Sequence, residues 1–314
     1  MMRRLMKRFL FLLSVVFVSG FSQAGEFKPV KHLIDTHIHL YDTTRDVEIT
    51  WPPTDDAVLF KPHLPAEYSK AAKAAGVSGV VIVEASNNLE DNQWVLDLVK
   101  EDPDFYIGLV GNVDVYREDF EAQINKLKQD KRFIGVRARR KGDIDYSDKR
   151  VLESLRVLAK HDLTMDYLTN GAGVSGIEKI DKVAKAIPEL QIVVNHCLGY
   201  DFDGKTPDTE WIAAVKSLAA NKNVYCKISG LYQRSVPQPA PQDPKHYEAV
   251  LDVLLQNFGQ ERLIYGSNWP CTKHTDDYAS FLALVDRFIS GKGQEAREGF
   301  YWGNAAKAYH LGLK

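Results

Sequence analysis

Eight short runs rich in β-branched and aromatic residues alternate with eight longer amphipathic stretches, and this alternation restricts the fold of the chain most. The runs cover residues 32–40, 77–85, 105–113, 133–139, 163–169, 191–196, 224–229 and 262–266. The amphipathic stretches cover residues 65–75, 92–100, 117–128, 149–161, 176–186, 209–220, 246–258 and 276–289. Eight strands, each followed by a helix, in about 290 residues predict an α/β fold of the (β/α)8 TIM barrel type. An open doubly wound sheet is the alternative, but no glycine-rich phosphate-binding sequence follows an early run.

The first 24 residues resemble a targeting segment rather than a part of the barrel. Four basic residues fall within the first eight positions, and residues 9–18 are apolar apart from Ser14. Ser22 and Ala24 form the small-residue pattern of signal cleavage, so we expect a signal peptide over residues 1–24. An uncleaved anchor is the alternative, but a membrane span needs a longer apolar run of about 20 residues. We therefore expect a periplasmic or secreted protein, free of the membrane after cleavage, with a single domain over residues 25–314.

The charge of the chain argues against two classes of partner. The formal net charge is −2, and acidic and basic residues are interspersed. We therefore expect a small-molecule substrate rather than nucleic acid or a membrane surface, and a homo-oligomer stays open. The three cysteines, Cys197, Cys226 and Cys271, are an odd number and contain no C-x-x-C pair. Packed free thiols are the first interpretation, and one bridged pair is the alternative.

Two histidines end the first predicted strand. By strand alternation Asp35, His37 and His39 point to one face, and the two histidine Cα atoms are about 7 Å apart. Both rings can therefore converge on one metal ion or one substrate oxygen. Alone, this pattern is weak, because two surface histidines on an exposed strand would look the same. Asp35 is expected to be a buried acceptor that orients one of the rings.

Polar side chains also end five of the later predicted strands. They are Glu84, Arg137 with Arg139, His196, Lys227 and Asn268. The carboxyl ends of the strands meet at one face of a barrel, and polar groups there are costly to bury without a partner or a task. These residues and the two histidines are therefore the candidate site. Trp51, in the long connection over residues 41–63, either roofs this pocket or packs the loop down.

The order of these motifs resembles the amidohydrolase superfamily. The motifs are D-T-H-I-H-L, V-E-A, G-V-R, V-N-H, K-I-S-G-L and R-L-I-Y-G-S-N-W-P, and they span nearly the whole predicted domain. Within the superfamily the chain is most similar to the amidohydrolase-2 (amidohydrolase-related) branch that contains sugar lactonases and 2-pyrone-4,6-dicarboxylate lactonase. The resemblance implies a metal-dependent-hydrolase-like barrel with a hydrolytic site. It also implies that His37, His39 and His196 polarise a lactone carbonyl and that an Asp in the last motif activates water, usually without metal.

The chain departs from the family pattern at three places. Asn268 stands where the last motif usually has Asp, and an amide cannot take the proton of water. The loss of a general base costs about 10²–10⁴ in rate. Asn195 replaces an Asp before His196, and alternation predicts that its side chain points away from the barrel interior. The fifth predicted strand, with Asp166 but no histidine, argues against a two-metal site.

Three interpretations of the histidine cluster stay open. In the first, His37, His39 and His196 hold a substrate carbonyl without metal, and another group such as Glu84 is the base. In the second, they bind one divalent ion, Zn or Mn, whose bound water has a pKa near 7. In the third, the site is catalytically silent and only binds a ligand, because of Asn268.

The first interpretation gives the leading hypothesis, a hydrolase that opens a lactone or cyclic ester of a sugar acid or small carboxylic acid. In it Asn268 hydrogen-bonds the attacking water or the substrate, Arg137 anchors a polar substituent, and the proton acceptor is Glu84 or His196. A mononuclear metal-dependent hydrolase or decarboxylase is one alternative, and a non-catalytic binding protein is the other.

Several charged residues and histidines have a functional and a structural interpretation. Arg137 and Arg139 either clamp substrate oxygens or form a salt bridge to Glu84 or Asp166. Lys227 either binds substrate or forms a structural ion pair. The remaining histidines divide into two groups, with solvent-exposed positions expected for His63, His161 and His310 and positions near the pocket for His246 and His274.

Overall fold

The computed structural model describes residues 29–169 and 171–313, which contain eight parallel strands paired in sequence order. The strands are β1 (Ile34–Ile38), β2 (Gly79–Val83), β3 (Tyr106–Gly111), β4 (Phe133–Val136), β5 (Thr164–Tyr167), β6 (Ile192–Val194), β7 (Val224–Ile228) and β8 (Leu263–Tyr265). Two hydrogen bonds of 2.8 Å, from His39 N to Trp269 O and from Asn268 N to His37 O, join the segment after β8 to β1. The predicted (β/α)8 barrel is confirmed. The predicted signal peptide lies outside the described residues.

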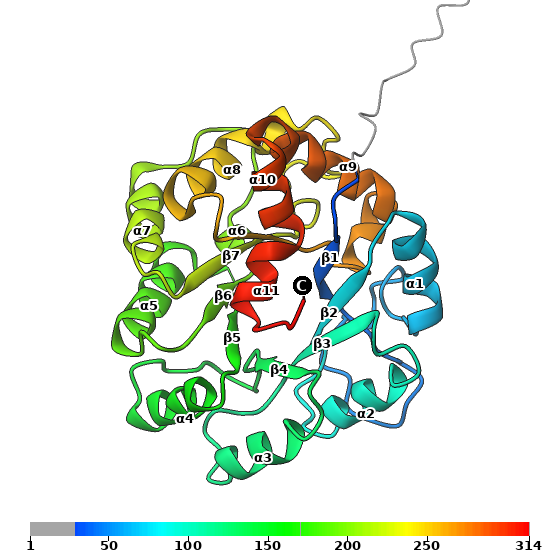
Figure 1. The fold of residues 1–314 in the computed structure, drawn as a ribbon, viewed down its shortest axis with the longest axis vertical. Coiled ribbons are helices and arrows are strands. Elements are labelled where there is room, and N and C mark those ends of the chain that lie inside the picture. Colours follow the sequence, from blue (N-terminus) through cyan, green and yellow to red (C-terminus); the bar gives the residue numbers. More distant parts are fainter. Residues whose placement is uncertain (1–28, 170, 314) are drawn as a thin grey trace, which may run out of the picture.

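Helices follow the strands and form a ring around the barrel (Figure 1). The helices that match predicted stretches are α1 (Pro65–Ala74), α2 (Asp91–Leu98), α3 (Phe120–Leu127), α4 (Lys149–Lys160), α5 (Gly173–Ala186), α7 (Thr209–Ala219), α8 (Lys245–Phe258) and α9 (Tyr278–Ile289). Elements that were not predicted are α6 (His196–Gly199), η1 (Cys271–His274), η2 (Ser290–Lys292), α10 (Gln294–Glu298), η3 (Gly299–Gly303) and α11 (Asn304–Ala308). Helix positions were therefore predictable, but short turns at the strand ends were not.

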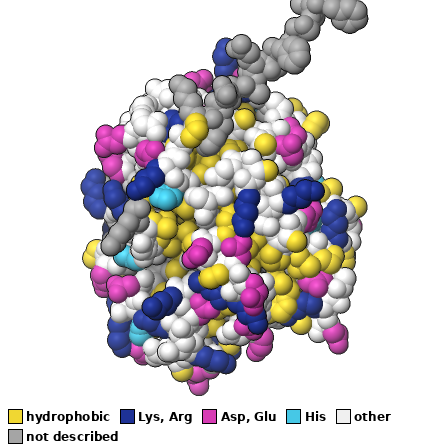
Figure 2. Space-filling view, turned by 45° about the vertical axis from the view of Figure 1, so that its right-hand side comes forward, with side chains coloured by type: hydrophobic (Ala, Val, Ile, Leu, Met, Phe, Trp, Pro, Cys, Tyr) yellow, Lys and Arg dark blue, Asp and Glu magenta, His cyan; other side chains and the backbone are white. Residues whose placement is uncertain are grey.

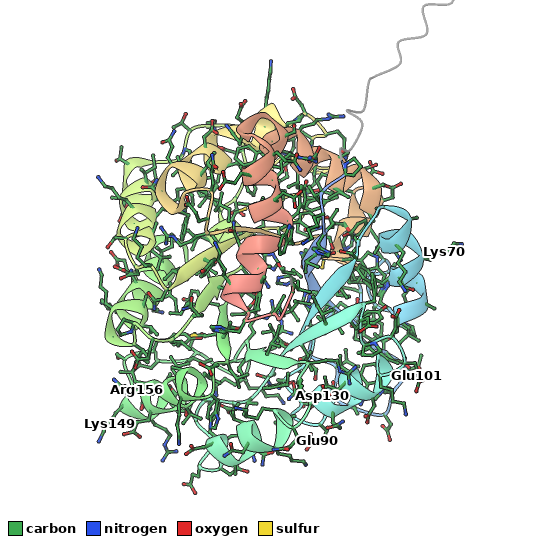
Figure 3. All side chains as sticks on the ribbon, viewed as in Figure 1. Lys70, Glu90, Glu101, Asp130, Lys149 and Arg156 are labelled. Carbon is green, nitrogen blue, oxygen red and sulfur yellow. The ribbon has the colours of Figure 1, made fainter. Side chains whose placement is uncertain are left out.

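Helix α4 shows why these stretches form helices against the barrel. The Asp148 side chain caps the helix by accepting a hydrogen bond from the backbone N–H of Arg150 at 2.7 Å. Val151, Leu155 and Leu158 recur at helical spacing and are fully buried. The charged Lys149, on the same helix, points outward in Figure 3. The apolar stripe thus packs on the strands while the charged face stays in solvent.

The amino-terminal end of the barrel is closed by the end of the chain. Figure 1 shows α11 lying across the strands. Its residues pack against a cluster of inward-facing strand residues, comprising Val81, Val83, Val110, Ile134, Val193 and Ile264 with Ala305, Ala308 and Tyr309. The predicted elements end at residue 289, so this plug was missed. Since one end is sealed, substrate reaches the interior from the carboxyl end.

Surface features agree with two expectations from the sequence. Acidic and basic side chains are interspersed over the face in Figure 2, with no large patch of one sign on it. Cys197, Cys226 and Cys271 are buried free thiols, as expected. None of the helices in the described part of the chain is long and apolar enough to cross a membrane.

Candidate functional site

A cavity of about 310 Å³, here called the mouth cavity, opens at the carboxyl ends of the strands. It is lined by His39, Trp51, Pro53, Asp56, Leu59, Arg137, Arg139, Leu168, His196, Gly230, Gln233, Arg234, Asn268, Cys271 and His274. The Trp51 ring lies 5.0 Å from the ring of His39 and 5.3 Å from that of Tyr41. Trp51 therefore lines the cavity and also packs the long loop down.

The barrel brings the three predicted histidines together. The ring centroids of His37 and His39 are 5.0 Å apart, and those of His37 and His196 are 4.4 Å apart. All three side chains are buried or nearly so, although His196 lies more than 150 residues from β1 in sequence. The convergence predicted from the strand ends is thus present in the structure.

Asp35 does not orient a histidine ring, which corrects one expectation. Its carboxylate accepts hydrogen bonds from the hydroxyls of Tyr68 at 2.9 Å and Tyr278 at 3.0 Å, on helices α1 and α9. It also accepts from the backbone N–H groups of His37 at 3.1 Å and Ser267 at 2.8 Å. The register of β1 against β2 shifts after Asp35, so simple alternation fails there. Asp35 therefore fixes the backbone that carries His37.

A left-handed turn at the end of β6 places His196. The backbone of His196, Cys197 and Leu198 has φ values of 50°, 51° and 60°, in the left-handed region. This turn packs the His196 ring against Gly230, where an added Cβ would lie 2.9 Å from Nδ1. Gly230 is therefore needed for the close approach. The Ser229 hydroxyl, next to it in the chain, lies 2.9 Å from His196 Nδ1.

The hydrogen bonds assign the protonated ring nitrogens of His39 and His37, whereas the Ser229 hydroxyl can either donate to His196 Nδ1 or accept from it. His39 Nδ1 lies 3.0 Å from the carbonyl oxygen of Val83, so it carries the proton and Nε2 has a lone pair. His37 Nε2 accepts from Arg137 Nη1 at 3.3 Å, which puts the His37 proton on Nδ1. His196 Nδ1 can accept from the hydroxyl of Ser229, which leaves Nε2–H as a donor toward the mouth cavity. Of the three rings, His196 is the one suited to polarise a carbonyl.

All three rings are neutral at neutral pH. Burial lowers the pKa of His37, His39 and His196 well below the ordinary value of about 6.5. The positive charge of Arg137 lowers each of these pKa values further. A neutral imidazole donates a hydrogen bond without carrying a charge that burial would penalise.

Arg137 is fully engaged inside the barrel. Its Nε donates to Glu84 Oε1 at 2.6 Å, its Nη2 to the Glu84 carbonyl oxygen at 2.9 Å, and its Nη1 to Asn195 Oδ1 at 3.2 Å. Arg139 forms a longer ion pair of 3.5 Å with Glu84 and is less buried. The structural interpretation of the arginines is therefore observed. Arg139 keeps more donors for substrate than Arg137, and Glu84 is held as a partner of both.

A connected set of paired polar groups, here called the polar column, runs through the barrel interior from Tyr309 to Asp166 and on through Asn195 and Arg137 to Glu84, with Lys227 bound to Asp166 as a branch. Asp166 accepts from Tyr309 at 2.8 Å, Lys227 at 2.7 Å and Asn195 at 2.9 Å. Lys227 is fully buried and also donates to the carbonyl oxygen of Thr36 at 2.7 Å. Lys227 thus has the structural role, and Asn195 points into the interior, contrary to the alternation argument. Val193 also faces the interior, so alternation along β6 itself places Asn195 there, and the left-handed backbone of His196 turns the next side chain toward the same side.

Asn268 lies at the mouth with an incomplete set of partners. Its backbone has a φ of 60°, and its Nδ2 donates to Gln233 Oε1 at 3.2 Å. Its Oδ1 is buried, and no described residue donates a hydrogen bond to it. A buried acceptor without a donor is costly, so this oxygen is suited to a water or a substrate hydroxyl.

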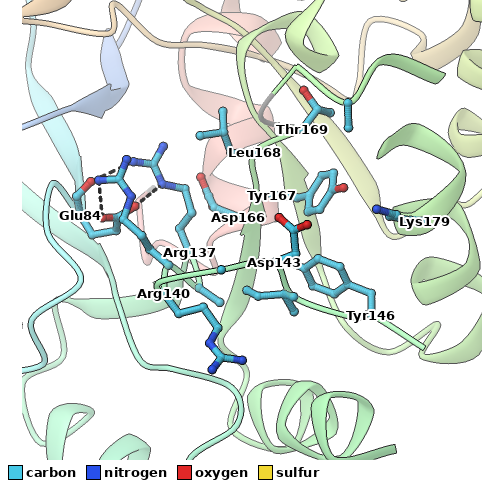
Figure 4. A pocket seen from close by; sticks show the side chains of 15 residues that line it. Glu84, Arg137, Arg140, Asp143, Tyr146, Asp166, Tyr167, Leu168, Thr169 and Lys179 are labelled. Atoms are coloured by element: carbon cyan, nitrogen blue, oxygen red, sulfur yellow. Dashed lines mark hydrogen bonds and ion pairs between the residues drawn. The ribbon is translucent and has the colours of Figure 1, made fainter. Parts of the chain in front are cut away.

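A second cavity of about 350 Å³ adjoins the mouth cavity at the ends of β4 and β5 (Figure 4). The two cavities share Arg137, Arg139 and Leu168 in their walls. Figure 4 shows the Arg137–Glu84 pair on one side and Tyr146 with Lys179 on the other. Together the two cavities form one elongated polar site at the carboxyl end of the barrel.

Sequence comparison agrees with this geometry. A model of the amidohydrolase family matches residues 34–311. The chain belongs to the amidohydrolase family. A protein of Burkholderia ambifaria named L-fucono-1,5-lactonase is 30% identical over 289 residues, covering 88% of this chain and 95% of the relative. The chain is thus a lactonase-like amidohydrolase, a hydrolase, and the resemblance seen in its motifs is confirmed.

Solved structures share the barrel of this amidohydrolase. An amidohydrolase of Burkholderia multivorans with bound HEPES superposes with a TM-score of 0.80 at 22% identity, covering 89% of this chain and 99% of the other. A B. multivorans amidohydrolase with bound zinc gives a TM-score of 0.78 at 22% identity with the same coverage. At these identities the likeness shows the fold alone.

The predicted metal alternative needs three imidazole nitrogens with free lone pairs, because a metal ligand must be unprotonated. In this amidohydrolase His37 Nε2 accepts from Arg137, whose positive charge would also repel a divalent ion. His39 Nε2 keeps a lone pair, but one ring does not make a site. Within residues 29–169 and 171–313, no group of three His, Cys, Asp or Glu side chains could hold a metal ion. The hydrogen-bonded cluster of His37, His39 and His196 therefore does not fit a metal ion.

The remaining histidines divide differently from the expectation. His63 is fully buried, with Nδ1 3.1 Å from Glu67 Oε2, because the long loop folds over it, so its predicted exposure is wrong. His310 is exposed, as expected. His246 contacts Ser235 at 2.9 Å and does not line the mouth cavity, whereas His274 does.

Several wall residues were missed by sequence reasoning. Ser229 follows Lys227 closely in the K-I-S-G-L motif, so the motif itself was the available signal. Gln233 and Asp56 lie on long loops where no periodic pattern places a side chain. Their positions depend on how the loops fold back over the barrel.

Proposed function

We propose that this amidohydrolase is an exported lactonase that opens the lactone ring of a sugar acid. The observation that carries the proposal is the 30% identity, over nearly the whole chain, to a relative named L-fucono-1,5-lactonase. The polar mouth cavity, with a neutral imidazole donor in its wall, supports the same chemistry.

In this proposal His196 donates from Nε2 to the carbonyl oxygen of the lactone. Its partner Ser229 can donate to Nδ1, which leaves the proton on Nε2. The negative charge that develops on this oxygen is stabilised by a donor already in place, a contribution of about 10²–10³ in rate. The nearby positive charge of Arg137 favours the same oxyanion.

The walls of the joined cavities suit a polyhydroxylated substrate. Arg139 lines both cavities and its side chain is 29% exposed, so its guanidinium can bind ring hydroxyls. Asn268 Oδ1 and Gln233 Nε2 are buried without hydrogen bonds to described residues and offer an acceptor and a donor. Polar atoms placed around a small cavity favour a sugar ring over an apolar ester.

Location and partners belong to the same proposal. The basic start, the apolar run and the small residues before position 25 support export through a cleaved signal peptide. The small net charge of −2 supports a small-molecule substrate rather than nucleic acid or a membrane surface.

A panel of 1,4- and 1,5-lactones of sugar acids, including L-fucono-1,5-lactone, tests the proposal. Hydrolysis is followed with a pH indicator against the spontaneous reaction and against His196→Asn. We expect saturable turnover of at least one sugar lactone by the wild type and little by the variant. Binding of sugar acids without turnover of any lactone would instead support the non-catalytic alternative that Asn268 favours.

A further inference from the structure

The proposed lactonase needs a proton acceptor, and the expected ones are engaged. Glu84 is held by Arg137 at 2.6 Å and by Arg139 at 3.5 Å. Asp166 is paired with Lys227 deep in the barrel. The amide of Asn268 accepts no proton near neutral pH. The base that activates water must therefore come from another part of the wall.

A histidine and a carboxylate form a hydrogen-bonded pair in the wall of the mouth cavity. His274 Nε2 lies 2.9 Å from Asp56 Oδ2, and the carboxylate can only accept, so the Nε2 carries the proton. In the neutral ring Nδ1 therefore has a free lone pair. Asp56 is itself fixed, because its Oδ1 accepts from the backbone N–H groups of Val58 at 3.1 Å and Leu59 at 3.0 Å.

The position of this pair matches the missing base. His274 ends η1, which begins directly after the β8 motif, and the N–H of Cys271 donates to the Asn268 carbonyl oxygen at 2.9 Å. His274 and His196 both line the mouth cavity of about 310 Å³. The His274 side chain is 39% exposed, so water can reach it.

The charges around His274 come from several elements. Asp56 lies on the loop after β1, and the neighbouring Lys273 is paired with Glu67 of α1. The other charged or titratable residues of the cavity wall are Arg137, Arg139, Arg234, His39, His196 and Cys271. A histidine held by a carboxylate, with its second nitrogen toward substrate, is a common arrangement of a general base.

We propose that His274, oriented by Asp56, is the general base of this lactonase, in place of the carboxylate that Asn268 lacks. The inference rests on the proposed function. His274 Nδ1 takes a proton from water while the water oxygen bonds to the carbonyl carbon, and the carbonyl electrons move to the oxygen held by His196. The tetrahedral intermediate then collapses, the ring C–O bond breaks, and the proton on His274 passes to the leaving oxygen. The product is a hydroxy acid, which loses its own proton to solvent.

The test compares kcat/KM of the wild type, His274→Gln, Asp56→Asn, Asn268→Asp and the double variant His274→Gln with Asn268→Asp. We expect His274→Gln to lose about 10²–10⁴ in kcat/KM, Asp56→Asn to lose less, and the double variant to regain most of the loss. The matched control is His310→Asn, at an exposed histidine after Tyr309 whose left-handed backbone Asn tolerates, and it should keep wild-type activity.

Several results would overturn the proposal. Wild-type turnover by His274→Gln would overturn it. A double variant that stays inactive would also overturn it. So would an Asn268→Asp protein that is active while the wild type is inert. If the thermal transition shows that His274→Gln does not fold, kcat/KM of Asp56→Asn, alone and combined with Asn268→Asp, decides in the same way. If neither the wild type nor Asn268→Asp opens any lactone, the proposed function itself is wrong and this inference falls with it.

Discussion

The polar column and the mouth cavity are both built from polar side chains, but they satisfy them differently. In the column Asp166 has three donors, and Lys227 has a carboxylate and a carbonyl oxygen. At the mouth, Asn268 Oδ1 and Gln233 Nε2 are buried without a described partner. Paired buried groups hold one geometry, whereas unpaired groups keep hydrogen bonds for a ligand. Hydrogen-bond pairing thus separates the polar groups that hold the barrel together from those that remain available to a ligand.

Removing one charged partner from the polar column should have the largest effect, and it should lower the free energy of unfolding. Lys227→Met leaves the Asp166 carboxylate buried with its main charge partner gone, and the loss of one partner of a buried ion pair costs about 3–5 kcal/mol. Urea unfolding of wild type and variant measures this free energy. Lys73→Met, which breaks the exposed 2.7 Å pair with Asp102, is the matched control and should cost at most about 1 kcal/mol. Equal losses in the two variants would contradict the distinction.

Replacing His196 in the mouth cavity should lower activity rather than stability. His196→Asn removes the ring donor but keeps a residue type that tolerates the left-handed backbone at this position. We expect kcat to fall by about 10²–10³, the effect of losing one oxyanion donor. Steady-state kinetics on the best lactone measures the loss of kcat. Urea unfolding at pH 8 is the control and measures whether stability is unchanged. Unchanged kcat would remove His196 from the proposed chemistry.

The pH dependence of stability sharpens the comparison. Burial lowers the pKa of His37, His39 and His196 in the folded protein, so between that lowered pKa and about 6.5 the unfolded chain binds more protons. Stability is therefore full above pH 6.5 and falls as the pH drops. Each histidine contributes a slope of up to about 1.4 kcal/mol per pH unit. Urea midpoints from pH 8 to 5 should show a smaller slope in His196→Asn, and an identical slope would refute the assignment.

Metal removal should have the smallest effect. Because His37 Nε2 accepts from Arg137, the mouth presents no set of three free imidazole nitrogens. We expect dialysis against a chelator to leave the lactonase rate within about twofold and bound zinc or manganese to be well below one ion per chain. Loss of activity that returns with one of these ions would show that the cluster rearranges to bind it.

The strand order and the histidine cluster were predictable because they depend on local pattern. Runs of β-branched residues mark strands, and a closed parallel barrel brings strand ends together at one face. His37, His39 and His196 therefore followed from their places at the ends of β1 and β6. The same reasoning put Glu84, Arg137 and Arg139 at one face of the barrel, and of the two salt-bridge partners considered, Glu84 is the one observed.

Side-chain direction was predicted less well where the backbone leaves the regular strand. In β1 the register shifts between Asp35 and Ile38, so Asp35 faces the helices while His37 faces the interior. At the end of β6 the left-handed backbone of His196 brings its side chain to the same side as Asn195. His63 is buried because a long loop folds over it, and no periodic pattern encodes that fold. Tyr309 was missed because it acts from beyond the last predicted helix.

The plug at the amino-terminal end has a consequence for the order in which this protein can mature. Asp166 gains one of its three donors from the hydroxyl of Tyr309, which follows α11 near the end of the described chain. While a ribosome makes the chain, every strand of the barrel is finished before that hydroxyl exists. The axial carboxylate therefore lacks one of its three donors until after all eight strands have been synthesised.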